Sequence, residues 1–286
     1  MRIFISMLLT VSMTLSVNAS AQQSGQQAAK QYPKNKTITF GVVPQQAANV
    51  LANVWVPLTQ YLSAETGITV KFATAKNIPN FEQRLSENAY DIAYMNPFHY
   101  IYFSEYNEYN AIAKQANKQI KGILVTRKDS NIKTIQDLHD KTLAFPAPAA
   151  FAASILPRAE LELNEVNFTP RYVSSHDSVY LNISKGFFVA GGGVMRTFNN
   201  MPEEVRDQLK IFWNTQPYTP HAVAASPSLS VEDTVAIQSA LENLHTTDIG
   251  REILKNLGMD AFVIAHDTDW DDVRNLNISK EHVKAK

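Results

Sequence analysis

The chain has 286 residues, of which 45% are apolar, and its 26 Lys and Arg against 27 Asp and Glu give a formal net charge of -1. This balance creates no basic field for a nucleic-acid backbone, so we expect no nucleic acid among its partners. Cysteine is absent, which excludes disulfides, thiol chemistry and a lipid-modified N-terminal cysteine. The length allows about two domains, each held by a hydrophobic core alone.

The first residues have the pattern of a secretory signal peptide. Arg2 precedes an apolar run from Ile3 to Val17, and Ala19-Ser20-Ala21 offers a cleavage site of small residues. The run is too short for a membrane anchor, so we expect residues 1–21 to be removed and the polar residues 22–36 to form a flexible lead-in. An exported chain without cysteine indicates a soluble protein of the bacterial periplasm.

Strand and helix patterns alternate along the rest of the chain. In order, we expect strands at residues 38–43, 69–73, 91–94, 142–145, 171–174, 187–190, 211–213 and 222–225. We expect helices at residues 47–65, 79–89, 135–138, 176–184, 231–244 and 249–257, with two more starting at Pro97 and Ala149. This alternation predicts the α/β class with parallel sheets and crossover helices.

The repeated pattern predicts two α/β lobes, the second inserted into the first. Lobe 1 would comprise residues 37–125 plus 222–286, and lobe 2 residues 126–221. Two segments near Gly122–Arg127 and Thr219–Ala225 would cross between them. Such a layout brings strand ends from both lobes to one cleft, where open α/β sheets bind ligands and around which the lobes can close.

One stretch, Lys141–Arg158, combines a short strand, two prolines and a helix start at Ala149. This geometry presents free backbone N–H groups and the positive end of a helix dipole to a ligand. An ordinary strand-to-helix connection explains the stretch equally well.

Catalytic signatures are missing from the sequence. It contains no nucleophile elbow, P-loop or zinc-protease motif. Ser174–Asp177 holds the residue types of a catalytic triad, but neighbours on one turn cannot align as nucleophile, base and orienting acid. His99, His176 and His221 lack the paired spacing typical of metal ligands. We therefore expect no enzyme, no catalytic residue, no cofactor and no metal site.

Six stretches share motifs with one family. They read GVVP (41–44), DIAYMNPFHY (91–100), VTRKDSNIKTIQDLHDKTLAF (125–145), PRAEL (157–161), SSHDSV (174–179) and TDIGREILKNLGMDAF (247–262). In order and spacing they resemble the PhnD-type periplasmic solute-binding proteins of phosphate, phosphite and phosphonate ABC importers. The resemblance implies a bilobal type II periplasmic-binding-protein fold, a small-molecule ligand in the cleft between the lobes, an ABC permease as partner and a monomer.

The ligand loop departs from the family pattern. Family members usually carry Pro-x-Ser-Thr-Ser-Gly at the helix start, and these hydroxyls bind the phosphonate oxygens. The matching positions here are Ala150, Phe151, Ala152 and Ala153, so all three hydroxyls are missing. A doubly charged oxyanion needs several strong donors to replace water, so we expect a ligand other than a typical phosphonate.

The other family contacts are partly kept. The family histidine is present as His176. Two positions at which amine-binding family members carry an acid are occupied here by Met195, which precedes Arg196, and by His221. The resemblance and the strand ends together predict ligand contacts from His176, Arg196, Ala150, Phe151, Ala152, Tyr94, Asn96 and His221. A less charged or more apolar ligand, flanked by Phe98 and Trp55, fits these residues, as does an acid with a single carboxylate.

Two downstream roles stay open. The closed protein can dock on an ABC permease and deliver its cargo. Alternatively, it can dock on the periplasmic domain of a membrane sensor, such as a histidine kinase or a cyclic-dinucleotide enzyme, and report ligand occupancy.

Overall fold

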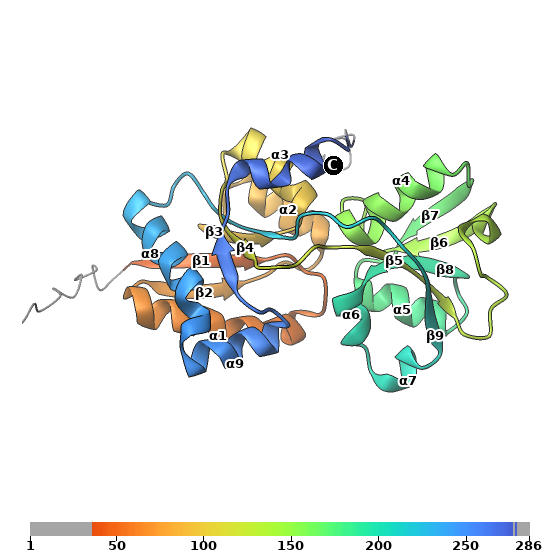
Figure 1. Ribbon diagram of the computed structural model, residues 1–286, viewed down its shortest axis with the longest axis horizontal. Helices are drawn as coiled ribbons and strands as arrows, with labels where there is room; N and C mark the ends of the chain where they lie inside the picture. The colour runs from red at the N-terminus through yellow and green to blue at the C-terminus, as the bar shows by residue number, and fades with distance from the viewer. Residues whose placement is uncertain (1–35, 277, 279–286) are drawn as a thin grey trace, which may run out of the picture. The chain divides into compact units, whose positions relative to one another are not determined.

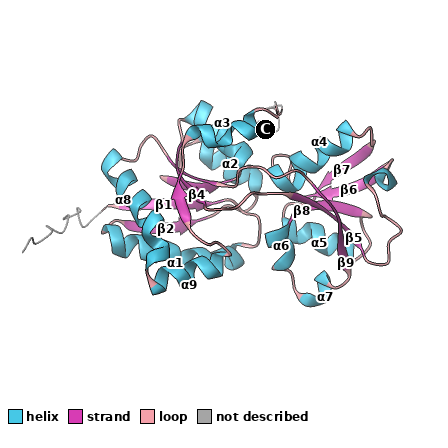
Figure 2. Cartoon of the chain, in the orientation of Figure 1, coloured by secondary structure: helices cyan, strands magenta, loops and turns pink. Residues whose placement is uncertain are grey.

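The computed structural model describes residues 36–276 and 278. The predicted signal peptide and nearly all of the lead-in, residues 1–35, lie outside this range. Two separate sheets with helices on their faces confirm the predicted α/β class (Figure 2). Within the described residues, no helix combines the length and hydropathy that a membrane crossing needs.

The first sheet is built from the two ends of the described chain. In spatial order its strands are β11 (Phe262–Ile264), β4 (Asn110–Gln115), β10 (Ala222–Ala225), β3 (Ile92–Met95), β1 (Thr37–Val42) and β2 (Thr69–Ala73). Helix α1 (Ala48–Thr66) packs against α8 (Val231–Glu242) and α9 (Asp248–Leu257), while α2 (Ile78–Ser86) packs against α3 (Pro97–Asn107). The α1 and α2 groups cover opposite faces of the sheet (Figure 1).

The second sheet comes from the middle of the chain. Its strands, in spatial order, are β7 (Phe168–Tyr172), β6 (Lys141–Phe145), β8 (Ala190–Val194), β5 (Gly122–Arg127) and β9 (Leu209–Asn214). One face packs on α4 (Leu156–Leu163) and the short η1 turn (Ile135–Leu138), through Leu161 and Leu138. The other face packs on α5 (His176–Ser184), α6 (Met195–Asn199) and α7 (Glu203–Arg206).

The strand directions correct part of the sequence prediction. Both sheets are mixed, because β10 runs antiparallel to β3 and β4, and β5 runs antiparallel to β8 and β9. Strands β4 and β11 are not predicted from the sequence at all. All five strands of the second sheet nevertheless lie between β4 and β10 along the chain, as the nested arrangement requires.

The crossing segments lie next to their predicted positions. Gly122–Arg127, predicted as a crossing, is β5 of the second sheet, and Ala222–Ala225 is β10 of the first. The chain instead passes between the sheets at residues 116–121 and 215–221. Backbone hydrogen bonds of 2.8 and 2.9 Å join Ile120 and Tyr218, one residue from each segment. The proposed boundary between residues 125 and 126 consequently falls inside β5.

The glycine run of the second sheet is a strand, not a turn. The strand predicted at 187–190 begins only at Ala190 and continues through Gly191–Gly193 as β8. A side chain at Gly192 would collide with the carbonyl oxygen of Ala153, and one at Gly193 with the Tyr180 hydroxyl. The glycines therefore allow neighbouring backbone and an aromatic ring to pack directly on the strand.

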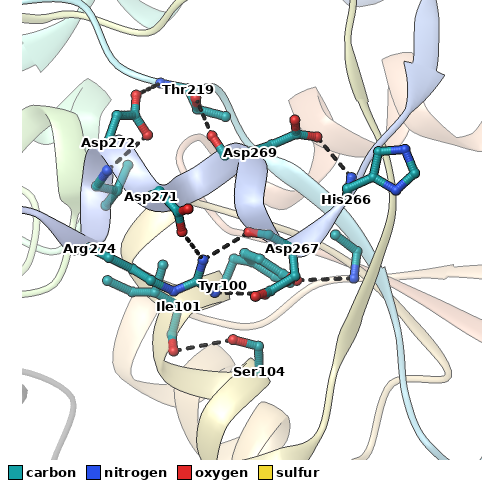
Figure 3. A network of polar contacts seen from close by, with 12 residues as sticks. Tyr100, Ile101, Ser104, Thr219, His266, Asp267, Asp269, Asp271, Asp272 and Arg274 are labelled. Atoms are coloured by element: carbon teal, nitrogen blue, oxygen red, sulfur yellow. Dashed lines mark hydrogen bonds and ion pairs between the residues drawn. The ribbon is translucent and has the colours of Figure 1, made fainter.

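The C-terminal part of the described chain holds the return crossing against the first sheet. Figure 3 shows Thr219 between two acids, with its N–H donating to Asp272 (2.7 Å) and its hydroxyl donating to the Asp269 carbonyl (2.8 Å). The buried Trp270 donates its indole N–H to the Pro220 carbonyl (2.9 Å). Asp269 and Trp270 belong to η4 (Asp267–Trp270), and Asp272 belongs to α10 (Asp271–Arg274).

The same C-terminal turn is anchored to α3. The hydroxyl of Tyr100 donates to Asp267 (2.7 Å), and Arg274 binds both Asp267 (2.6 Å) and Asp271 (2.9 Å) (Figure 3). The Tyr100 and Trp270 rings lie 4.4 Å apart. The return crossing is therefore tied to the first sheet as far as Pro220.

We expect Trp270→Ala to lower the free energy of unfolding by about 3–5 kcal/mol, because it leaves a cavity and removes the bond to Pro220. Urea unfolding at neutral pH measures this loss. Phe187→Ala, at a position 70% exposed, is the control and should change the free energy of unfolding by less than about 0.5 kcal/mol. Equal stability of the two variants would contradict the anchoring role.

Candidate functional site

The candidate site lies where strands of both sheets end. Strand β1 leads to Gln45, β3 leads to Asn96, β6 leads to the loop of residues 146–150, and β8 leads to Arg196. The return crossing adds His221 directly before β10. Ligands of open α/β sheets bind at such carboxyl ends, so these side chains are the candidates for contact with a solute.

Gln45 connects the residues of the site. Its Oε1 accepts a 2.6 Å hydrogen bond from the Arg196 guanidinium, and its backbone carbonyl accepts the His176 N–H at 3.3 Å. Its amide nitrogen lies 3.1 Å from His221 Nε2, and because the amide nitrogen only donates, Nε2 is the acceptor. The buried residue Gln45 thus joins three residues that lie far apart in the sequence, two through its side-chain amide and one through its backbone carbonyl.

The hydroxyl groups of Thr197 and Tyr180 form a hydrogen-bonded chain that ends at the His176 ring. The Nδ1 of this ring lies 3.2 Å from the Thr197 hydroxyl, which in turn lies 2.9 Å from the Tyr180 hydroxyl. The Tyr180 hydroxyl also donates to the Val194 carbonyl at 3.1 Å. Helix α5 and the start of α6 therefore set the orientation of this imidazole.

The two histidines of the site are uncharged. Burial, assisted by the Arg196 charge, lowers the pKa of His176 to about 3. Burial and then Arg196 also lower the pKa of His221 well below its usual range. The His221 ring stacks on Tyr94, with centroids 4.9 Å apart and planes 14° apart. Neutral imidazoles offer hydrogen bonds to a solute but add no positive charge at neutral pH.

Asn96 joins α3 to the loop after β6. Its Oδ1 accepts the His99 N–H (2.8 Å), which caps the helix, and its Nδ2 donates to the Ala149 carbonyl (3.0 Å). The His99 ring pairs with buried Glu82 at 2.9 Å. Both ends of the Asn96 amide are thus occupied by protein groups, so the structure favours a linking role for Asn96.

The helix start after β6 is packed with apolar groups. It opens with a π-helical turn, Phe151–Ile155, that runs into α4, so the helix begins two residues later than predicted. The Phe151 ring is 1% exposed and meets the Tyr218 ring edge-on, with centroids 5.8 Å apart. Within the described chain, the N–H groups of residues 151–153 have no backbone acceptor, whereas the Ala150 N–H donates to Ala147. The adjoining cavity measures only about 10 Å³, about the space that one water needs.

A larger pocket opens beside this small cavity. Its volume is about 310 Å³, and Gln45, Tyr94, Arg196 and His221 are among its lining residues. The crossing segment of residues 116–121 supplies a further wall. The two cavities share Gln45, Ile120, Val194 and His221.

All eight residues predicted as ligand contacts border one of these cavities. Tyr94, Arg196 and His221 line the larger pocket, and Asn96, Ala150, Phe151, Ala152, His176 and again His221 line the smaller one. Contact with a ligand remains a prediction for each of them. Phe98, expected to flank the ligand, and Trp55, for which the sequence favours core packing over a place in the cleft wall, are fully buried core residues outside both cavities.

Sequence reasoning missed three residues of the site. Gln45 follows the proline that ends the first predicted strand, a position at which a polar residue is common and gives no signal. Lys118 and Lys121 flank Ile120 on the outgoing crossing and line the larger pocket. Only the correct placement of the crossing at residues 116–121 could have assigned these lysines to the site.

Comparison with known proteins places the chain in a wider group. Residues 40–270 match the family model described as the periplasmic substrate-binding protein of the phosphonate ABC transporter. A binding-protein component of an ABC phosphonate transporter from Pseudomonas aeruginosa superposes with a TM-score of 0.78 at 18% identity, covering 85% of each chain. PhnD1 from Prochlorococcus marinus, solved with methylphosphonate, gives a TM-score of 0.76 at 20% identity and covers 85% of this chain and 98% of its own.

A third structure, XAC2383 from Xanthomonas citri bound to ATP, gives a TM-score of 0.66 at 15% identity and covers 85% of this chain and 96% of its own. At these identities the superpositions show a shared fold. They leave open which solute this chain takes.

We expect the neutral histidines to make the protein less stable in acid. Below pH 6.5 the unfolded chain binds a proton at His176, whereas the folded chain does so only near pH 3, so stability falls as the pH falls through this window. From pH 7 to pH 5 the loss is about 2 kcal/mol for this group. In urea unfolding, the free energy of unfolding of His176→Gln should fall less between pH 7 and pH 5 than that of the wild type, because the variant lacks the contribution of His176. Parallel pH profiles of the two proteins would contradict a buried neutral His176.

Proposed function

This chain belongs to the family of periplasmic substrate-binding proteins of phosphonate ABC transporters, and from that premise we propose that it captures a small solute in the pocket bordered by Arg196 and His221. Delivery to the membrane permease of an ABC importer is the corresponding partner interaction. The observation that carries the proposal is the meeting of both sheets at Gln45, which bonds Arg196 and the His176 backbone of the second sheet. Closure on a solute would act at this contact.

We propose a solute other than a typical phosphonate. The positions that carry hydroxyls in the family are here Ala150, Phe151 and Ala152, all buried. The cavity beside them, about 10 Å³, leaves no room for a phosphonate group. The backbone N–H groups of residues 151–153 remain, but alone they replace few of the hydrogen bonds that a dianion makes in water.

The same solute capture would also serve a sensor. The three missing hydroxyls favour a solute other than a phosphonate, and such a solute would suit a receptor that reports its presence. In that case the closed form would bind the periplasmic domain of a membrane kinase or cyclic-dinucleotide enzyme. Co-purification from membranes with ligand present separates the two roles, since it recovers either a permease or a sensor.

We expect Arg196→Gln to weaken solute binding at least about tenfold, because a charge-assisted hydrogen bond contributes roughly 1.5–3 kcal/mol. The probe is the compound that most raises the melting temperature in a metabolite screen, and calorimetry gives its affinity. Arg171→Gln, at an exposed position on β7, is the matched control and should bind as the wild type does. Unchanged affinity in Arg196→Gln would refute the site.

We expect the triple change Ala150→Ser, Phe151→Thr and Ala152→Ser to create affinity for methylphosphonate. Removing the Phe151 ring enlarges the small cavity and should lower the free energy of unfolding by about 3 kcal/mol, while the new hydroxyls supply donors. The double change Ala150→Ser and Ala152→Ser, which keeps the ring, is the control and should gain little. If calorimetry finds no methylphosphonate binding by the folded triple variant, the blocking role of Phe151 is wrong.

A further inference from the structure

The larger pocket carries an unusual set of charges. Among its lining residues are three cations, Arg196, Lys118 and Lys121, and no Asp or Glu. The lysines lie on the outgoing crossing segment and Arg196 lies at the start of α6. Positive charge therefore comes from two separate elements that face one space.

None of these three cations is neutralised within the described part of the chain. The ion pairs found there involve other basic residues, namely Lys36 with Asp233, Lys114 with Asp269, Arg127 with Asp129, Arg251 with Asp248, and Arg274 with Asp267 and Asp271. Arg196 interacts with the neutral amide of Gln45 and with the hydroxyl of Tyr94. Like charges that face one pocket without counter-charges attract an anion into it.

The rest of the lining combines apolar surface with hydrogen-bonding groups. Side-chain amides come from Gln45, Gln115, Gln119, Asn199 and Asn200. A volume of about 310 Å³ lies at the lower end of the range of small-molecule pockets. Such a pocket accepts a compact polar molecule whole, without need of the blocked cavity beside Phe151.

We propose that this pocket binds an organic anion with at least two carboxylate or phosphate groups, one held at Arg196 and the other at Lys118 and Lys121. The inference rests on the proposed function, since it specifies the solute of the same site. It differs from both solutes that the sequence leaves open, a less charged or more apolar ligand and an acid with a single carboxylate, because the two lysines line the pocket as well.

The lysines distinguish this proposal from capture of a monoanion. A single carboxylate on Arg196 leaves Lys118 and Lys121 without an anionic partner. A second anionic group of the solute meets the lysines directly and replaces the missing counter-charge. Affinity should therefore depend on the charge of the solute and on ionic strength together.

The experiment measures binding of succinate, citrate and 2,3-bisphosphoglycerate to the full mature protein by thermal shift and calorimetry. Acetate and glucose are the comparison compounds. We expect at least one multiply charged probe to bind, and Lys118→Gln or Lys121→Gln to weaken that binding about three- to tenfold. Lys71→Gln, at an exposed position on β2, is the matched control and should leave affinity unchanged.

Two outcomes overturn the inference: none of the three probes binds, or the best probe binds both lysine variants as tightly as the wild type. The proposed function is tested separately by Arg196→Gln and the metabolite screen. A neutral or singly charged solute that needs Arg196 but ignores both lysines would leave the proposed function standing and remove the inference. Binding that needs the lysines but not Arg196 would overturn both, because the inference and the proposed function each place an anionic or polar group of the solute at Arg196.

Discussion

The site depends on one arginine whose charge no described carboxylate balances. Arg196 is half-buried at the start of α6, and it donates to the amide oxygen of Gln45. A carboxylate at that position would neutralise the guanidinium and compete with an incoming anion, whereas an amide orients the guanidinium and leaves its charge in place. The same charge adds to burial in keeping His176 and His221 neutral, and it opposes the rise that burial causes in the pKa of Tyr94.

The topology explains why these residues meet. The second sheet is inserted between β4 and β10, so the strand ends of both sheets border the passages of the chain between them. The C-terminal turn of residues 267–274 then binds Thr219 and Pro220 of the return passage, and it does so from the first sheet. His221, the next residue, is consequently held in place relative to Tyr94 and Gln45 rather than moving with the second sheet.

The periodic elements could be predicted from the sequence, and the site only in part. Helix α1 and helix α9, each ended by a glycine in the left-handed conformation, follow apolar spacing that local chemistry determines. The sequence predicts a crossing where β5 lies, because the apolar runs of strands and of buried connections look alike. The sequence of the three glycines of β8 is equally compatible with a turn, and the close approach of Ala144, Ala153 and Tyr180 explains why a strand needs glycine there.

Some features of the site depend on contacts between segments that are distant in the sequence, and these could not be predicted from local patterns. The family resemblance predicts Phe151 in the site, but its packing against Tyr218, which is distant in the sequence, could not be predicted from the sequence. The contacts of Gln45 depend likewise on three other segments. The bridge between Ile120 and Tyr218 has a mechanical consequence of this kind. This single bridge joins the two connectors, so we expect a bend in one of them to be coupled to a bend in the other. A solute held by Lys118 and Lys121, which lie on either side of Ile120, would therefore contact the connection between the two sheets directly.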